Sequence, residues 1–433
     1  MEWVYISDLK DHIGETITIK GWMYNIRSSK KIHFLQLRDG TGRIQGIMEK
    51  KKVGDEVFNR IKRLKIESSV VITGQARKDD RAPSGFELDV ESLEIISEPD
   101  EDYPISKKEH GIEFLMDNRH LWLRSSKQFH VLRIRNEVIK AIRDFYNSRA
   151  YILVDTPIFT GAIGEAAGNL FEVKYFDYGN AYLAQTGQLY LEAACMSLGK
   201  VYNLGPTFRA EKSKTRRHLT EFWMNEAEVA YYDNEDNMRL QEDFVSFVVQ
   251  QVLRTAGEDL EAIGRDTSKL EKIEAPFPRM SYDDAIEFLH QNGYDDIQWG
   301  DDLGAEHETV ISDQFEKPVM VYNYPAKAKA FYMEPHPDRP DVVLCNDMLA
   351  PEGYGEIIGA SQRIHDYDVL VEKIKENNLP MESYDWYLDL RKYGSVPHSG
   401  YGLGVERTVS WISGIKHVRE AIPFPRTLNR LKP

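Results

Sequence analysis

The first quarter of the chain alternates hydrophobic and polar residues in short runs that turn residues separate. In KIHFLQLRD, Leu35 and Leu37 fall on one face of an extended segment and Phe34 falls on the other. The runs ETITIKGWM, GRIQGIM, SSVVITGQA and GFELDVESLEIIS continue this pattern over residues 14–97. We therefore predict five short strands, with one helical insertion near 56–64.

Five strands with a single helical insertion are typical of a small closed barrel of the oligonucleotide-binding kind, the OB-fold. If the leucine face forms the barrel core, Phe34 stands on the outer face, where an aromatic ring can stack on a base. Periodicity alone leaves a second interpretation open, in which Phe34 belongs to a small core on that outer face.

The pattern changes after the barrel. Residues 98–123 are charged and show no sustained period, which predicts a linker. A helix follows, because apolar residues recur at spacings of three and four from Val131 to Phe145. The run YILVDTPIF then reads as a strand with Pro157 near its end, and a proline there favours a sheet edge or a subunit boundary. The predicted organisation is a barrel over 1–100, a linker over 101–123 and a second domain over 124–433.

Charged residues in the second domain follow the period of strands. VYNLGPTFRAE and TEFWMNEAEVAYYD read as two strands around the loop KSKTRRHL. Arg209 and Glu211 share a face of the first, and Glu226 and Glu228 share a face of the second. Buried charges at this density are costly unless they are paired or bind a ligand. The hairpin is therefore a candidate binding site.

Two further segments carry candidate chemistry. In HSGYGLGVER, alternate glycines precede a helix predicted from about Val405, an arrangement that either lets a ligand approach the backbone or is only a tight turn. In NDMLAPEGYGEIIGASQR, Asp347 and Glu356 precede Arg363, and two spaced carboxylates beside phosphate suit Mg²⁺.

The charge distribution narrows the choice of ligand. The formal net charge is −15, yet residues 1–97 hold 17 Lys and Arg against 15 Asp and Glu. Within the acidic remainder, FRAEKSKTRRHLTEFW concentrates positive charge, which favours an anionic ligand. No apolar run approaches 18 residues, and the N-terminus shows no secretory signal. Cys195 and Cys345 lie far apart, so we expect core residues and a reducing cytoplasm rather than a disulfide or zinc site.

These segments together resemble the class II aminoacyl-tRNA synthetases. FRAE…RRHLTEF is similar to their motif 2, GLGVER to motif 3, and the strand ending in TPIF to motif 1, with Pro157 at a homodimer interface. GWMYNIR…FLQLRDGTGRIQ is similar to the anticodon-binding barrel of the aspartyl, asparaginyl and lysyl subgroup. The resemblance implies an α+β fold: a five-stranded OB-fold barrel followed by an antiparallel catalytic sheet flanked by helices. It also implies ATP, Mg²⁺, tRNA and an amino acid as ligands.

The resemblance implies a role for each matching residue. Arg209 and Arg407 would be catalytic, Arg209 by binding the α-phosphate of ATP and the attacking carboxylate. The ATP site would comprise Arg209, Glu211, Arg217, His218, Leu219, Phe222, Glu356, Gly404 and Arg407, with Phe222 and Arg407 on either side of the adenine. The amino-acid site would comprise Glu165, Gln185, Gln188, Leu191, Arg209, Glu226 and Arg363. Glu356 and Asp347 would bind Mg²⁺, and Phe34 and Gln45 would read the anticodon.

Residue differences within the subgroup favour asparagine. Aspartyl enzymes carry a lysine where this chain has Leu191 in QTGQLYLEA, so the substrate carboxylate would lack a counter-ion. Glu226 replaces a shorter aspartate and would accept a hydrogen bond from a side-chain NH₂ while repelling a carboxylate. Arg363 would donate to the side-chain oxygen. Gly359 departs from archaeal-type aspartyl enzymes, which place a metal-binding serine there. Glu165 lies in a Gly- and Ala-rich segment that reads as a mobile lid or an ordinary turn.

Three alternatives stay open. The chain could charge aspartate as well as asparagine, although Leu191 and Glu226 disfavour this. It could make free asparagine, but such a paralogue is expected to lack the N-terminal barrel. It could be a non-catalytic RNA-binding protein on a synthetase scaffold, a class that tends to lose the motif residues retained here.

Overall fold

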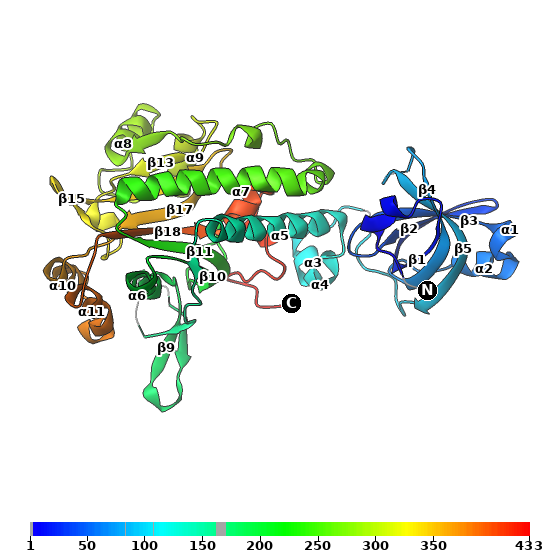
Figure 1. Cartoon of the computed structure of the whole chain (residues 1–433), viewed down its shortest axis with the longest axis horizontal. Helices are drawn as coiled ribbons and strands as arrows, with labels where there is room; N and C mark the ends of the chain where they lie inside the picture. The colour runs from blue at the N-terminus through cyan, green and yellow to red at the C-terminus, as the bar shows by residue number, and fades with distance from the viewer. Residues whose placement is uncertain (1–2, 83, 107, 162–169) are drawn as a thin grey trace. The chain divides into compact units, whose positions relative to one another are not determined.

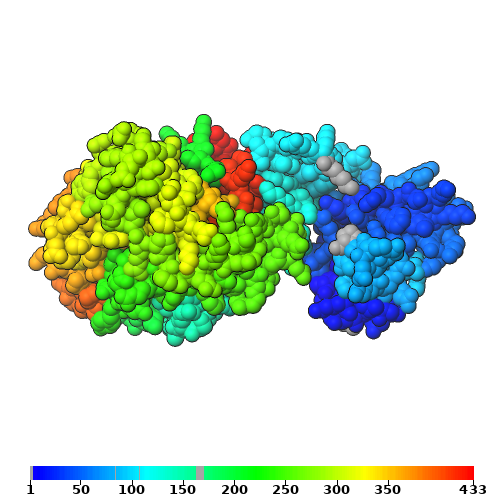
Figure 2. All heavy atoms as spheres, turned by 90° about the horizontal axis from the view of Figure 1, so that it is seen from above, coloured from blue at the N-terminus to red at the C-terminus, as the bar shows by residue number. Residues whose placement is uncertain are grey.

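The protein consists of two compact units, Met1–Ile112 and Glu113–Pro433, seen in a computed structural model (Figure 1). The structure describes residues 3–82, 84–106, 108–161 and 170–433. In the space-filling view the first unit is the blue body (Figure 2). No helix within these ranges combines the length and apolar character needed to cross a bilayer.

The first unit is the five-stranded barrel that the alternation predicts. It closes in the order β1-β2-β3-β5-β4, with β3 and β5 parallel and the other pairs antiparallel. Its elements are β1 (Thr16–Ser29), β2 (Ile32–Arg38), β3 (Arg43–Glu49), α1 (Lys50–Val53), α2 (Asp55–Ile61), β4 (Ser69–Lys78) and β5 (Phe86–Ser97). Leu35 and Leu37 are buried in the barrel core, whereas Phe34 is half-buried on the opposite face of β2 and outside that core cluster.

The second unit is built on an eight-stranded sheet in the order β12-β13-β16-β17-β18-β11-β10-β6. The strands are β6 (Ile152–Leu153), β10 (Lys200–Phe208), β11 (Glu221–Ala230), β12 (Arg279–Ser281), β13 (Val319–Tyr322), β16 (Cys345–Ala350), β17 (Gly355–Gln362) and β18 (His398–Gly404). All neighbours are antiparallel except the two edge pairs, β12–β13 and β10–β6. The predicted antiparallel sheet is therefore correct for the interior and wrong at both edges, where long connections containing helices allow parallel pairing.

Helices cover the sheet. The long helices α5 and α7 lie side by side along it, and α6 packs against β10 and β11 (Figure 1). The helices are α5 (Ser126–Asn147), α6 (Gln188–Leu198), α7 (Asn234–Ala262), α8 (Tyr282–Gln291), α9 (Ala305–Ser312), α10 (Tyr367–Glu376), α11 (Asp385–Lys392) and α12 (Val405–Ser413). The period from Val131 to Phe145 is confirmed, because these apolar residues of α5 lie in the main core. Two smaller sheets complete this unit. One joins β7 (Phe159–Thr160), β9 (Asn180–Leu183) and β8 (Glu172–Lys174), and the other joins β14 (Pro335–His336) and β15 (Arg339–Val343).

Two segments differ from the sequence-based expectation. The second half of the predicted linker forms α3 (Ile112–Asp117) and α4 (Arg119–Trp122). Arg119 is buried there and donates to the carbonyls of Pro423 and Ile422, both at 2.8 Å, so tertiary contacts order a segment without a period of its own. The run around Pro157 is not one strand but the separate strands β6 and β7, because proline has no N–H to continue a ladder.

Candidate active site

Two adjoining cavities lie against the central strands β11, β17 and β18. Both are open to solvent, and the space within them is about 600 Å³ in the first and about 990 Å³ in the second. Arg209, Met224, Glu356 and Gly402 line both cavities, so this group marks the point where they meet. A ligand could therefore extend from one cavity into the other past Arg209 and Glu356.

The first cavity gathers all of the residues expected to bind ATP. It is lined by Arg209, Glu211, Arg217, His218, Leu219, Phe222, Glu356, Gly404 and Arg407, together with neighbours from β11 and α12. The Arg209 guanidinium carbon lies 5.5 Å from the centre of the Phe222 ring. Burial and the nearby Arg407 lower the pKa of His218, whose Nε2 lies 3.7 Å from a Glu211 oxygen. Such cationic groups can bind the phosphates of a nucleoside triphosphate, and an aromatic face can stack on its base.

Arg217 is held more tightly than the sequence suggests. Its Nη1 donates to Glu308 at 2.9 Å. Its Nη2 donates to Thr309 Oγ1 at 2.7 Å and to the carbonyl of Gly353 at 2.6 Å. These contacts tie the end of the motif 2 loop to α9 and to the turn between β16 and β17. The guanidinium still borders the cavity, but it is also a structural clamp.

The alternate glycines of HSGYGLG form strand β18 rather than a turn. Space requires glycine at Gly400, where a Cβ would lie 2.0 Å from Glu228 Oε2 and 2.3 Å from the Ala227 carbonyl oxygen. A Cβ on Gly402 would meet only the flexible end of Met224, at 2.5 Å. The helix α12 begins at Val405, as predicted. Its Arg407 donates to Glu356 Oε2 at 3.0 Å and to the Glu356 carbonyl at 2.8 Å, which joins α12 to β17.

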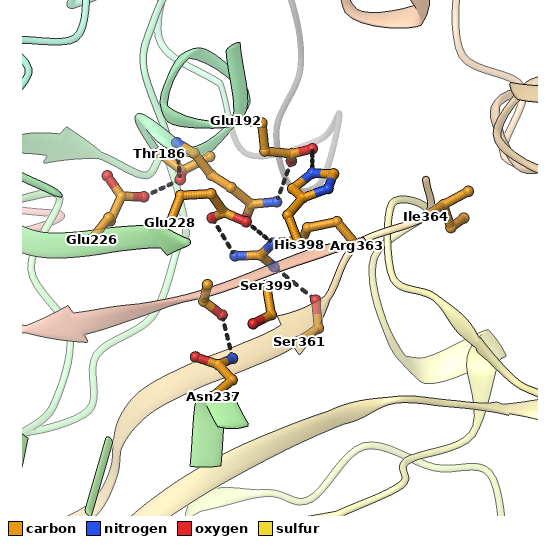
Figure 3. Close-up of polar contacts among 12 residues, drawn as sticks. Thr186, Glu192, Glu226, Glu228, Asn237, Ser361, Arg363, Ile364, His398 and Ser399 are labelled. Atoms are coloured by element: carbon orange, nitrogen blue, oxygen red, sulfur yellow. Dashed lines mark hydrogen bonds and ion pairs between the residues drawn. The ribbon is translucent and has the colours of Figure 1, made fainter. Parts of the chain in front are cut away.

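The second cavity contains the carboxylates of β11. Glu226 is buried and accepts from Thr186, from the Gly187 amide at 2.9 Å and from Asn203 at 2.9 Å. Beside it, Glu228 forms a bidentate pair with Arg363 at 2.9 and 3.0 Å (Figure 3). Burial raises the pKa of Glu228, and Arg363 opposes that effect.

Arg363 also donates to Ser361 Oγ at 2.7 Å, so its guanidinium is fixed on three sides. This cavity is lined by four of the residues predicted to bind the amino acid: Gln188, Arg209, Glu226 and Arg363.

Two other predicted residues are placed differently, and a third is not described. Leu191 is fully buried among Cys195 and Val201, on the side of α6 that packs against β10, and does not line either cavity. Gln185 is buried and is also absent from both linings among the described residues. Glu165 lies outside the described residues. The two cysteines are buried and unpaired, as expected.

Several lining residues were missed from the sequence. Lys329 is the most prominent: its Nζ donates to Asp347 at 2.6 Å and lies 3.8 Å from the centre of the Tyr324 ring. Glu308 of α9 also lines the second cavity, where burial and the neighbouring Glu356 raise its pKa to about 7. Both come from loops or short helices without a distinctive period. The sequence does place Glu228 on one strand face with Glu226, but it was not predicted to bind the amino acid.

The carboxylates of Asp347 and Glu356 suit a magnesium ion. They lie on paired strands, and a Cβ on Gly359 would be 3.2 Å from Glu356 Oε1 and 3.8 Å from Asp347 Oδ1, so one oxygen of each converges there. Their other oxygens pair with Arg407 and Lys329. No group of three or more His, Cys, Asp or Glu within the described ranges could hold a metal, but Mg²⁺ often takes only one or two carboxylates besides phosphate and water.

The barrel of the first unit presents a separate candidate surface. Phe34 pairs with Ile47 and Gln36 pairs with Gln45 between β2 and β3, which puts Phe34 and Gln45 on the same outward face. Gln45 Nε2 donates to Glu87 Oε1 at 2.7 Å, so its amide orientation is set by β5. An aromatic ring beside a fixed amide can stack on one base and hydrogen-bond to it.

Comparison with known proteins gives consistent results for both units. Residues 111–428 match the family model of class II tRNA synthetases (D, K and N), and residues 17–96 match an OB-fold nucleic acid binding domain. The chain is 56% identical to an asparagine–tRNA ligase of Symbiobacterium thermophilum and 55% identical to one of Chloroflexus aurantiacus, with 98–100% of each chain covered.

Solved structures give the same result. Asparaginyl-tRNA synthetase of Pyrococcus horikoshii, complexed with asparaginyl-adenylate, superposes with a TM-score of 0.96 at 46% identity and full coverage of both chains. The Entamoeba histolytica asparaginyl-tRNA synthetase in complex with asparaginyl-adenylate gives 0.87 at 35% identity, with 97% of each chain covered.

Proposed function

Since the chain belongs to the class II tRNA synthetases of the D, K and N group, we propose that it is an asparagine–tRNA ligase. It activates asparagine with ATP and transfers the asparaginyl group to tRNA. The observation that carries the assignment to these residues is the junction of the two cavities at Arg209 and Glu356. A nucleotide in the first cavity and an amino acid in the second would meet there.

In the first step the asparagine carboxylate attacks the α-phosphate of ATP and pyrophosphate leaves. Arg209 at the junction can hold both the attacking carboxylate and the α-phosphate, because a guanidinium binds oxyanions through two parallel donors. Phe222 and Arg407 would enclose the adenine. Such a site needs no side-chain nucleophile, since alignment of the reactants and stabilisation of charge at phosphorus lower the barrier.

The second cavity supports selection of an amide. Glu226 already accepts from three donors, with the Gly187 amide shared between its two oxygens, so its carboxylate has room for about one more hydrogen bond, for which a side-chain NH₂ is a suitable donor. Arg363, fixed by Glu228 and Ser361, would donate to the amide oxygen. Leu191 is buried on the side of α6 that packs against β10, so its role would be that it adds no cation to the pocket, not that it contacts the substrate.

Magnesium would be held by Glu356 and Asp347 and would stabilise the negative charge of the ATP phosphates. Lys329 and Arg407 hold the two carboxylates so that one oxygen of each stays directed at the space above Gly359.

The partners follow from the remaining surfaces. The barrel would bind the anticodon of tRNA(Asn) through Phe34 and Gln45. The exposed apolar residues Ile158 and Phe159, next to Pro157, would form a homodimer interface. A tRNA substrate and two buried, unpaired cysteines fit the cytoplasm as its compartment.

The test is exchange of pyrophosphate into ATP, measured separately with asparagine and aspartate. We expect exchange with asparagine and a specificity constant for aspartate lower by about 10⁴-fold, as for sites that read a polar group through buried partners. Comparable exchange with both amino acids would identify an aspartyl enzyme of relaxed specificity. A lack of exchange with either amino acid would favour a non-catalytic RNA-binding protein. Free asparagine formed from aspartate would instead indicate the paralogue that makes free asparagine.

A further inference from the structure

A carboxylate behind the second cavity is the centre of a buried polar network. Glu192 of α6 is fully buried and lies one helical turn after Gln188, which borders the cavity. It accepts from Gln188 Nε2 at 3.1 Å, from Arg391 at 2.6 Å and from the Tyr387 hydroxyl at 2.8 Å. It also accepts from His398 Nε2 at 2.9 Å (Figure 3). These donors come from three elements, so Glu192 joins α6 to α11 and β18.

The hydrogen bonds of His398 define its charge. Its Nδ1 lies 2.8 Å from the Val396 carbonyl, which can only accept, so Nδ1 carries a proton. Its Nε2 lies 2.9 Å from Glu192 and donates to that carboxylate when Glu192 is ionised, so His398 is then its cationic partner. Burial acts to raise the pKa of Glu192, but Arg391 and His398 outweigh it and hold that pKa far below its usual range. Glu192 is thus an anion between two buried cations.

The network reaches the cavity at two points. Because Glu192 can only accept, it holds the NH₂ of Gln188 and leaves the Gln188 carbonyl oxygen for other donors. On the opposite side, Arg391 Nε donates to the Ile364 carbonyl at 2.8 Å, and the Arg363 amide donates to the His398 carbonyl at 3.0 Å. The same group therefore supports the backbone that carries Arg363.

The charges around this end of the cavity balance. This layer holds three carboxylates and three cations, all at least nine-tenths buried: Glu192, Glu226 and Glu228, and Arg363, Arg391 and His398. Glu192 pairs with Arg391 and His398, and Glu228 pairs with Arg363, whereas Glu226 accepts from neutral donors. A neutral amide leaves that balance intact. A substrate carboxylate would add a buried charge without a counter-ion, which is strongly unfavourable.

We propose that Glu192 is a positioning residue for amino-acid selection: it orients Gln188 and neutralises Arg391 and His398, which would otherwise act as counter-ions for a substrate carboxylate. The inference rests on the proposed function. According to this proposal, selectivity for asparagine over aspartate depends on buried residues behind the cavity as well as on the residues that line it.

The test is Glu192→Gln, which keeps the shape and removes the charge. In pyrophosphate exchange at saturating ATP, we expect the ratio of the asparagine to the aspartate specificity constant to fall by about 10- to 100-fold, as for partners that orient site residues. The KM for ATP should stay within about twofold. A ratio within about twofold of wild type would overturn the proposal, whereas a wild-type protein without exchange would instead refute the proposed function.

The chain offers a matched control. Asp259 is also a buried carboxylate between a histidine and an arginine, with His130 Nδ1 at 2.7 Å and Arg133 Nε at 2.9 Å, but it borders neither cavity. Asp259→Asn should lower the melting temperature and leave the selectivity ratio unchanged. If it changed the ratio as much as Glu192→Gln, the effect would be one of general stability, and the positioning role would be refuted.

A second variant keeps the proposal testable if Glu192→Gln does not fold. His398→Gln removes one cation from the same layer, leaves negative charge in excess and should raise the ratio. The double variant Glu192→Gln with His398→Gln loses one charge of each sign and should lie closer to wild type than either single variant. A ratio that does not respond to His398→Gln, or that falls, would contradict the charge argument.

Discussion

Arg209 lies where the two cavities meet. It follows β10, lines both cavities and lies beside the Phe222 ring. We expect Arg209→Ala to reduce pyrophosphate exchange by about 10²–10³-fold, because it removes a preorganised donor from the α-phosphate. Rates measured at saturating substrates, together with a melting curve, check this prediction.

Arg216 is the control for this change, since it lies in the same loop but lines neither of the two cavities. Arg216→Ala should retain exchange within a few-fold of wild type. Near-normal exchange in Arg209→Ala would remove motif 2 from the proposed mechanism.

At the scale of elements, β2 and β3 form a surface that should act independently of the catalytic sheet. Phe34→Ala should weaken tRNA charging by about 1–3 kcal/mol, the contribution of one stacked base. Pyrophosphate exchange should not change, because the amino-acid and ATP cavities are built entirely from the second unit. Aminoacylation and exchange assays on the same preparation distinguish the two effects.

Leu35→Ala is the contrasting variant, because Leu35 is fully buried in the barrel core. It should lower the melting temperature by creating a cavity, at a cost of about 2–5 kcal/mol. If Phe34→Ala behaved like Leu35→Ala, Phe34 would be a core residue rather than a base-stacking one.

At the scale of the whole molecule, the apolar edge near β7 should hold two copies together. Ile158 and Phe159 are 42% and 51% exposed, and contiguous exposed apolar surface can mark a protein–protein contact. Ile158→Asp should shift sedimentation from dimer to monomer, since a carboxylate cannot be desolvated there without a partner. Tyr393→Asp, on another exposed aromatic, should leave the assembly unchanged. A wild-type monomer at micromolar concentration would contradict the homodimer.

The sequence by itself determined the elements whose side chains repeat with a period. Alternation over 14–97 specified the barrel strands, and spacings of three and four specified α5, because each pattern follows from the geometry of one local element. The motif residues from Arg209 to Phe222 lie on one hairpin, but their roles were predicted from the family resemblance rather than from a period.

Tertiary structure alone decided what non-neighbouring segments place together. Lys329 and Glu308 reach the site from loops and a short helix whose local pattern carries no functional signal. The burial of Leu191 and the joining of Glu192 to Arg391 and His398 depend on how α6 packs against β10, α11 and β18. A periodic pattern reports which face of an element is apolar, but the partner of a buried charge is set by packing between elements far apart in the chain.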